Sequence, residues 1–265
     1  MKLWILLPAY NEENSFETLI PRISNHLERE GYDFKIIVCD DGSNDKSAEV
    51  LETLKQSHPL EVLTHKINRG LGETSRDLFE RAAELADPDD IIVRLDCDNT
   101  HKPKYISKLI RKMNQDYDVV TASRFQKGGG QIGVTPYRAF ISYSAQIFMK
   151  TVFGFWGQKE FSSGFRAYRA AIIQKAIKIY GNQFIQLKGL GFTCTLEKLV
   201  KLKMIGARFA EIGFKLRYDQ KTSSSKMITS ITTLGYLTMA VLYHWPFGGW
   251  KCQWPKEIKE YELHH

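Results

Sequence analysis

Short apolar runs alternate along the chain with longer segments whose apolar residues recur at helical spacing. The runs at residues 3–7, 35–39, 61–64, 91–95 and 118–122 predict strands. The segments between them, at about residues 15–30, 45–56, 72–85 and 104–114, predict helices. Strands that alternate with helices are joined by crossovers, which produce a mainly parallel sheet. We therefore expect an α/β fold with a mainly parallel central sheet flanked by helices.

The end of the chain shows a different pattern. The apolar residues of segment 227–243 recur at roughly helical spacing and predict an amphipathic helix: Ile228, Ile231, Leu234, Met239 and Leu242. An aromatic, turn-rich stretch follows at residues 245–250. Two arrangements fit this helix, packing on the core or lying in a membrane interface. We therefore divide the chain into a main domain, residues 1–226, and a C-terminal amphipathic helix with an aromatic tail, residues 227–265.

Two predicted strands end in acidic loops. Asp96-Cys97-Asp98 follows one apolar run, and Asp40-Asp41-Gly42-Ser43 follows another. Side chains two positions apart on a strand share a face, so the Asp96 and Asp98 carboxylates would repel each other unless a cation lies between them. Carboxylate oxygens select a hard divalent ion such as Mg²⁺, which typically also binds substrate phosphates. Two acidic strand ends together predict a binding crevice at the carboxyl edge of the sheet.

Charge and cysteine usage narrow the partners and the compartment. The formal net charge is +7, which favours anionic partners such as nucleotide phosphates, a lipid phosphate or a membrane surface. Nothing in the sequence resembles a nucleic-acid-binding module, so we expect no nucleic-acid partner. The four cysteines lack zinc-site spacing, and a reduced, cytosolic environment fits them best. We see no signal peptide and no apolar run of 18 residues, so we expect no spanning helix.

Six segments, in this order, resemble the motifs of family-2 glycosyltransferases with the GT-A (Rossmann-like) fold. They are Leu6-Leu7-Pro8-Ala9-Tyr10-Asn11-Glu12, Asp40-Asp41-Gly42-Ser43-Asn44-Asp45, Asn68-Arg69-Gly70-Leu71-Gly72, Asp96-Cys97-Asp98-Asn99-Thr100-His101, Ser162-Ser163-Gly164-Phe165-Arg166-Ala167-Tyr168, and Leu216-Arg217-Tyr218-Asp219 followed by Ser225-Lys226-Met227. Their order and spacing are similar to those of the dolichol-phosphate mannose synthase-like branch, the polyprenyl-phosphate glycosyltransferases. The resemblance implies inverting, metal-dependent transfer of a sugar from a nucleotide-sugar donor, of GDP-mannose or UDP-glucose type, to a polyprenyl (dolichyl or undecaprenyl) phosphate.

The resemblance also implies a donor site and a metal site. The residues expected to bind the nucleotide-sugar are Pro8, Ala9, Tyr10, Glu12, Asp40, Asp41, Asn68, Gly70, Asp96 and Cys97. The Pro8 turn would leave backbone groups of Ala9 and Tyr10 facing the nucleotide, and Asp40 or Asp41 would accept hydrogen bonds from base or ribose. Asp96 and Asp98, with Thr100 as a direct or water-mediated ligand, would hold Mg²⁺ or Mn²⁺ on the diphosphate. His101 is expected to make a structural hydrogen bond.

The acceptor side is expected to carry basic residues. The residues expected to bind the acceptor phosphate are Arg124, Ser163, Arg166, Arg217 and Lys226, and those expected to be catalytic are Asp98, Arg124, Ser163 and Arg166. Guanidinium forks suit a phosphate well. A phosphate monoester is already ionised and needs only positioning and neutralisation. We expect a peripheral enzyme at the cytoplasmic face of the membrane, attached by its C-terminal helix or by a membrane-anchoring subunit.

Three alternatives stay open. A family-2 enzyme acting on a sugar or protein hydroxyl would need a general base, and Glu160 lies where one is expected. A non-catalytic sugar-nucleotide-binding regulator should have lost its metal carboxylates, whereas this chain keeps both. A nucleotidyltransferase would need a Gly-rich, basic loop after the first strand, and residues 8–14 are acidic without glycine. Arg94 places a charge inside the metal strand, and the sequence offers no account of it.

Overall fold

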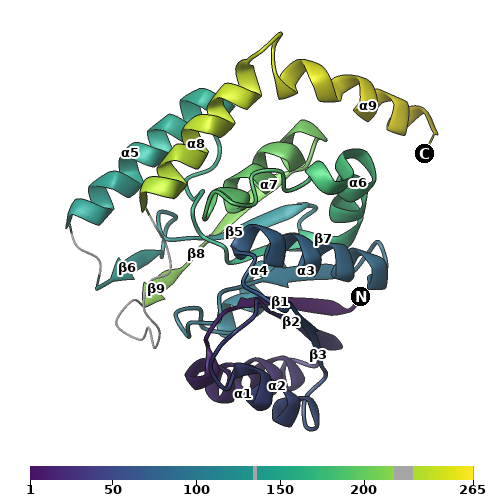
Figure 1. The fold of residues 1–265 in the computed structure, drawn as a ribbon, viewed down its shortest axis with the longest axis vertical. Helices are drawn as coiled ribbons and strands as arrows, with labels where there is room; N and C mark the ends of the chain where they lie inside the picture. The colour runs from purple at the N-terminus through teal and green to yellow at the C-terminus, as the bar shows by residue number, and fades with distance from the viewer. Residues whose placement is uncertain (134–135, 218–228, 265) are drawn as a thin grey trace.

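The computed structural model describes residues 1–133, 136–217 and 229–264. Within them, one sheet has the strand order β3-β2-β1-β4-β7-β5-β8 (Figure 1). Its strands are β1 (Leu3–Ala9), β2 (Phe34–Asp40), β3 (Leu60–Thr64), β4 (Ile91–Arg94), β5 (Val119–Ser123), β7 (Arg166–Arg169) and β8 (Phe209–Gly213). β7 runs antiparallel to β4 and β5, and the other neighbours are parallel. The predicted α/β fold with a mainly parallel sheet is confirmed.

Helices cover both faces of the sheet. One face carries α1 (Glu13–Arg29), α2 (Ser47–Lys55) and α4 (Lys104–Met113), and the other carries α3 (Leu71–Leu85), α6 (Ala170–Tyr180) and α7 (Thr193–Met204). A short 3₁₀ turn, η1 (Gly181–Gln183), follows α6. The predicted strands and the helices between them are present, with ends shifted by a few residues.

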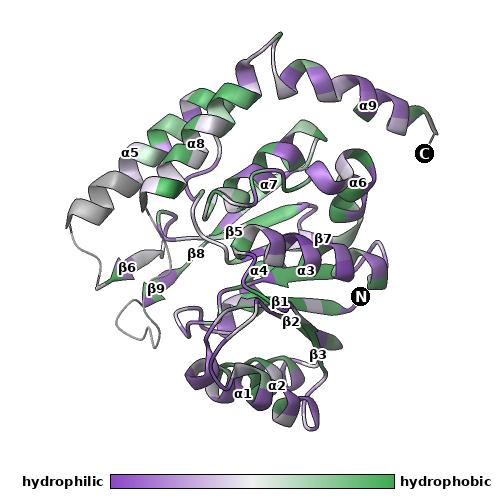
Figure 2. Cartoon of the chain, viewed as in Figure 1, coloured by the Kyte–Doolittle hydropathy of each residue, from purple (hydrophilic) through white to green (hydrophobic). Residues whose placement is uncertain are grey.

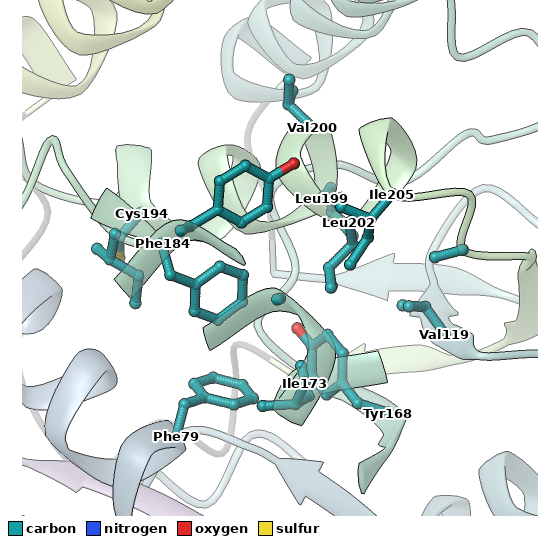
Figure 3. Close-up of a cluster of buried hydrophobic side chains, with 14 of the residues drawn as sticks. Phe79, Val119, Tyr168, Ile173, Phe184, Cys194, Leu199, Val200, Leu202 and Ile205 are labelled. Atoms are coloured by element: carbon teal, nitrogen blue, oxygen red, sulfur yellow. The ribbon is translucent and has the colours of Figure 1, made fainter. Parts of the chain in front are cut away.

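Every residue of β1 is buried, because a parallel strand covered on both faces has no solvent side. Its Leu3, Ile5 and Leu7 pack toward α1 and α4, whereas Trp4 and Leu6 pack toward α3 and α6. Figure 3 shows part of this second cluster, where the rings of Phe79 and Tyr168 meet edge to face with centroids 5.1 Å apart.

The C-terminal region adds elements outside these layers. α5 (Pro136–Phe153) and α8 (Thr229–His244) lie side by side, and α9 (Trp250–His264) follows them (Figure 1). β6 (Gly130–Ile132) and β9 (Lys215–Arg217) form a small parallel sheet. Met239 of α8 and Trp250 and Trp254 of α9 belong to the same buried cluster as α6 and α7. No described helix is long and apolar enough to cross a membrane.

The sheet topology determines where a ligand can bind. β2 adjoins β1 on one side and β4 adjoins it on the other, so the strand order reverses between β1 and β4. The loops that follow these strands leave the same edge because the strands are parallel. Open α/β sheets bind ligands outside the carboxyl ends of their strands at such a switch point. The predicted crevice at the acidic strand ends matches this edge.

Candidate active site

The loop after β4 is a tight turn that presents the Asp96 and Asp98 carboxylates. The Asp96 N–H donates to His101 Nδ1 at 3.1 Å, which closes the turn. Thr100 donates its hydroxyl and its N–H to Asp98 Oδ1, at 2.5 and 3.2 Å. Asn99, between them, has a φ of +61°, a left-handed conformation uncommon outside glycine. This conformation holds Asp98 and Thr100 in contact.

His101 stabilises this loop by its hydrogen bond and by packing of its ring. Its ring stacks on Phe165 with centroids 4.9 Å apart, and its side chain is buried. Burial lowers the pKa of His101, although the Asp96 and Asp98 carboxylates oppose the shift. A neutral ring can accept the Asp96 N–H at Nδ1, so the expected structural hydrogen bond of His101 is confirmed.

Arg94 lies directly under the metal motif. Its Nη1 is 2.6 Å from Asp96 Oδ1, and its side chain is only 4% exposed, against 32% for that of Asp96. A Cβ at Gly164 would lie 1.3 Å from Arg94 Nη1, so the guanidinium occupies space that only a glycine leaves open. The charge that the sequence left unexplained is therefore the partner of Asp96.

The donor set of this edge fits a hard divalent cation that also binds substrate phosphates. Asp96 and Asp98 are both partly exposed and offer carboxylate oxygens from one turn. Among the residues that the structure describes, no group of three or more His, Cys, Asp or Glu side chains is arranged to hold a metal ion by itself. Mg²⁺ usually binds through one or two carboxylates, with phosphates and water completing its shell. The pair therefore suits a cation that is completed by a ligand.

The second acidic pair, Asp40 and Asp41, is built differently. Both side chains are 2% exposed. Asp41 accepts hydrogen bonds from the Arg69 N–H and from the Gly70 N–H, each at 2.8 Å, and from His65 Nδ1 at 2.6 Å. Asp40 Oδ1 accepts the Ser43 hydroxyl and N–H. Asp41 thus fixes the loop that starts α3, and Asp40 fixes the loop after β2.

The loops that follow β1 and β2 are bonded to each other. The Asn11 N–H donates to Ser43 Oγ at 2.8 Å, and the Glu12 N–H donates to Ser47 Oγ at 3.0 Å. Gly42 allows the loop after β2 to approach the loop after β3, because a Cβ there would lie 2.5 Å from the Ile67 carbonyl carbon. These bonds preorganise the loops at the edge of the sheet where the sequence predicts a crevice.

The expected donor residues are distributed unevenly over this edge of the sheet. Pro8 and Ala9 are buried strand residues, and the Ala9 carbonyl accepts the Asp41 N–H at 2.9 Å. The Ala9 carbonyl is therefore used within the fold, and the expected contact of the Ala9 and Tyr10 backbone with a nucleotide would rest on their other groups. Tyr10 is half-buried and Asn68 is exposed, while Glu12 is buried and accepts the Ser15 hydroxyl.

The acceptor-side motif is organised around Glu160. Arg124, just after β5, makes a two-bond fork to Glu160, with Nε 2.7 Å from Oε2 and Nη2 2.8 Å from Oε1. Glu160 Oε1 also accepts the N–H groups of Ser162 and Ser163. Arg124 Nη2 lies 2.7 Å from Ser162 Oγ. One buried ion pair therefore joins the end of β5 to the loop that enters β7.

This geometry excludes Glu160 as the general base. Its side chain is fully buried, which by itself would raise its pKa, but Arg124 and the hydrogen bonds from Ser162 outweigh burial and lower it. A carboxylate that is ionised, enclosed and fully hydrogen-bonded is a poor proton acceptor.

Two further expectations are corrected by burial. Arg166 is 0% exposed and donates to the Thr195 and Phe161 carbonyls, at 2.8 and 2.7 Å, so its side chain cannot reach an acceptor phosphate. It holds the core between β7 and α7 together. Cys97 is buried in the cluster that contains Leu95, and its side chain cannot contact a nucleotide. The turn after β4 directs the Cys97 side chain inward, while Asp96 and Asp98 on either side of it stay partly exposed.

The remaining expected residues are placed as follows. Ser163 is half-buried, and its hydroxyl accepts the Phe165 N–H at 3.2 Å. Arg217 ends β9 and is partly buried. Lys226 lies outside the described residues. The edge therefore brings together Asp96, Asp98, Thr100, Arg124 and Ser163.

Sequence reasoning missed His65, which supports the Asp41 loop, and Lys198, which lies in the core beside α3. His65 bridges Asp41 and Asp77, with Nε2 2.9 Å from Asp77 Oδ2. Lys198 of α7 is buried with its ammonium 4.5 Å from the Phe79 ring centroid, and burial lowers its pKa to about 7. No spacing in the sequence marks these residues, because their partners are distant along the chain. Only Arg94 carried a signal, as a charge inside an apolar strand.

Comparison with known proteins agrees with this architecture. Residues 4–176 match the profile of the family described as Glycosyl transferase family 2. The chain is 30% identical over 215 residues to a dolichol-phosphate mannosyltransferase from Pyrococcus furiosus, covering 81% of this chain and 56% of that protein. The chain thus spans little more than half the length of this relative.

Solved structures share the fold at lower identity. Glucosyl-3-phosphoglycerate synthase from Mycobacterium tuberculosis, in complex with Mn²⁺, UDP and glucosyl-3-phosphoglycerate, superposes with a TM-score of 0.59. It is 17% identical, and the match covers 91% of this chain and 78% of that one. Mannosyl-3-phosphoglycerate synthase from Rubrobacter xylanophilus has a TM-score of 0.55 at 15% identity, covering 91% of this chain and 72% of that one. At such identity these structures support the GT-A fold alone.

Proposed function

This chain belongs to glycosyl transferase family 2, and we propose that it transfers a sugar from a nucleotide-sugar to a polyprenyl phosphate, with inversion and with a divalent cation. The observation that carries the proposal is the Arg124–Glu160 pair. Because Glu160 is held in this pair, it cannot act as the general base that a hydroxyl acceptor would need. An acceptor that is already ionised needs no general base.

The identity of donor and acceptor rests on similarity. The Pyrococcus furiosus relative is a dolichol-phosphate mannosyltransferase, which supports a polyprenyl phosphate as the acceptor and mannose as the transferred sugar. We propose a donor of the GDP-mannose or UDP-glucose type. Retention of both Asp96 and Asp98 favours an enzyme over a binding regulator.

In the proposed reaction a phosphate oxygen of the acceptor attacks the anomeric carbon of the donor sugar. The new bond joins that oxygen to the carbon, the bond from the carbon to the diphosphate oxygen breaks, and the nucleoside diphosphate leaves on the opposite face. Asp96 and Asp98 would hold Mg²⁺ or Mn²⁺, which neutralises the leaving diphosphate. Arg124, 10% exposed at its side chain and fixed by Glu160, would orient the acceptor phosphate.

We further propose that α5 and α8 dock on a membrane surface. α8 is apolar on two faces, since Met239 and Tyr243 are buried against the core while Leu234, Leu237 and Val241 are 53–57% exposed. Exposed Tyr143 and Ile147 extend this surface along the adjacent α5, and exposed Trp245 and Phe247 follow α8: we call these seven residues the apolar platform. Figure 2 shows apolar colouring along α8 and on the coloured part of α5. Apolar area and interfacial aromatic residues bind lipid without spanning it.

Acceptor choice tests the proposed function. The purified chain is incubated with Mn²⁺ and radiolabelled GDP-mannose or UDP-glucose, and with either a polyprenyl phosphate or the same polyprenol without its phosphate. Label should move to the phosphate acceptor, with at least about a hundredfold preference, since a base worth roughly 10²–10⁴-fold is missing for the alcohol. Comparable turnover on the polyprenol would contradict the proposal.

Vesicle flotation tests the docking proposal. The chain should float with vesicles that contain anionic lipid, and Leu237→Asp together with Val241→Asp should abolish flotation without lowering Tm. Leu263→Asp is the matched control, because Leu263 is 85% exposed at the far end of α9 (Figure 1). A wild-type chain that stays in the soluble fraction, with and without polyprenyl phosphate in the vesicles, would leave a separate membrane subunit as the explanation.

A further inference from the structure

Arg94 is a costly residue in the place it occupies. It is 3% exposed, and its Nε is buried without a hydrogen-bond partner among the described residues. Arg166 lies directly opposite on the antiparallel strand β7, so both cationic side chains leave the sheet on the same face. Like charges directly opposite each other destabilise a sheet. Costly residues of this kind are found at functional sites more than elsewhere.

The guanidinium of Arg94 is also held in position. Its Nη1 fills the space above Gly164, where a Cβ would lie 1.3 Å away, and its only ion pair in the described chain is with Asp96. Phe165, the next residue after Gly164, stacks on His101 of the metal motif. Packing of the segment around Gly164 therefore holds Arg94 next to Asp96, the first carboxylate of the metal motif.

A fixed cation changes what the acidic pair can bind. Asp96 and Asp98 together would attract a divalent ion strongly, but the charge of Asp96 is already balanced by Arg94 at 2.6 Å. A cation bound by Asp96 would also lie close to the Arg94 guanidinium, which is enclosed at Gly164. A bound diphosphate would supply negative charge in place of the charge of Asp96, which Arg94 neutralises.

We propose that Arg94 is an internal counter-ion that suppresses binding of the free metal ion and makes cation binding depend on the nucleoside diphosphate. Arg94 acts through Asp96 and is a positioning residue. This inference rests on the proposed function, because it takes Asp96 and Asp98 as the cation-binding pair. It assigns the order in which the site fills, with the cation held only when the diphosphate is present.

Mn²⁺ binding, measured by electron paramagnetic resonance of the free ion, tests the proposal without an activity assay. Wild-type chain and Arg94→Met are titrated with Mn²⁺ alone and with Mn²⁺ plus GDP or UDP. Arg94→Met should bind Mn²⁺ alone about tenfold more tightly, and the gain in affinity on adding the diphosphate should shrink by the same factor. Arg94→Lys keeps the charge and should behave like the wild type. Arg208→Met, which removes an exposed arginine from its Asp118 pair, is the matched control and should change nothing.

Gly164→Ala gives an independent result if Arg94→Met does not fold. The new Cβ must displace the guanidinium from Asp96, so free Mn²⁺ should bind more tightly, as in Arg94→Met. Unchanged or weaker binding of free Mn²⁺ in both folded variants overturns the inference and leaves the proposed function intact. A wild-type chain that binds Mn²⁺ with neither GDP nor UDP would overturn both.

Discussion

The two acidic strand ends look alike in the sequence and differ in the structure. Asp40 and Asp41 follow β2 and are 2% exposed. Their oxygens accept hydrogen bonds from backbone and side-chain donors of the surrounding loops. Asp96 and Asp98 follow β4 and stay partly exposed, with Asp96 at 32%. The first pair fixes the loops at this edge of the sheet, and the second pair is partly exposed there. The role of a carboxylate at a strand end is thus decided by the hydrogen-bond donors around it rather than by its sequence motif.

Among the variants that test the contrast between the two acidic pairs, Asp98→Asn should have the largest effect on sugar transfer. Transfer should fall by more than the roughly 10–100-fold that loss of a supporting residue costs at a metal site, because Asp98 is proposed to touch the cation itself. Tm should stay within a few degrees of the wild type. Asp89→Asn, at an exposed acidic residue, is the control and should keep full activity. Retained transfer in Asp98→Asn would remove Asp98 from the proposed metal site.

Glu160→Gln extends the comparison to a third carboxylate. Breaking a buried ion pair costs roughly 3–5 kcal/mol, so the variant should be much less stable at pH 7. The pKa of Glu160 is lowered in the folded state, so its stabilisation is complete above the unfolded pKa of about 4.3 and is lost as pH falls through the folded pKa. Urea unfolding at pH 7 and at pH 3.5 should show the gap narrowing. A gap that is small at pH 7 would contradict the scaffold role.

Asp41→Asn sharpens the contrast with Asp98. One acceptor oxygen becomes an amide that faces a backbone N–H, which should cost about 1–3 kcal/mol of folding free energy. Binding of Mn²⁺ with GDP or UDP should survive in the folded variant. Thermal unfolding and Mn²⁺ titration on one sample separate the two effects. A stable Asp41→Asn that has lost nucleotide binding would mean that Asp41 contacts the ligand.

The order of strands and helices was predictable because local apolar patterning determines each element. The sequence also placed both acidic ends at one edge, since parallel strands share their polarity. Arg166 was assigned wrongly because its motif position says nothing of Thr195 and Phe161, which enclose it. Glu160 stayed open as the general base of a hydroxyl-directed enzyme until its distant partner Arg124 was placed. Burial and long-range pairing, which no spacing encodes, decided these roles.

Lys198→Met carries the comparison to a buried cation. Burial lowers the pKa of Lys198 to about 7 from 10.5, so the folded state resists its protonation. The cost of this cation is complete below pH 7 and fades between pH 7 and 10.5. Lys198→Met should raise Tm at pH 6.5 by roughly 2–4 °C per kcal/mol recovered, and the gain should shrink at pH 9.5. A gain that grows with pH would contradict the shift.

Removal of divalent cations tests the central claim most directly. The wild-type chain, dialysed against EDTA, is assayed for transfer of labelled sugar to a polyprenyl phosphate before and after addition of Mg²⁺ or Mn²⁺. If the exposed pair Asp96 and Asp98 faces a cation on the donor diphosphate, transfer should be lost in EDTA and restored by the metal. Full transfer in EDTA would contradict the account, because both acidic pairs would then be structural.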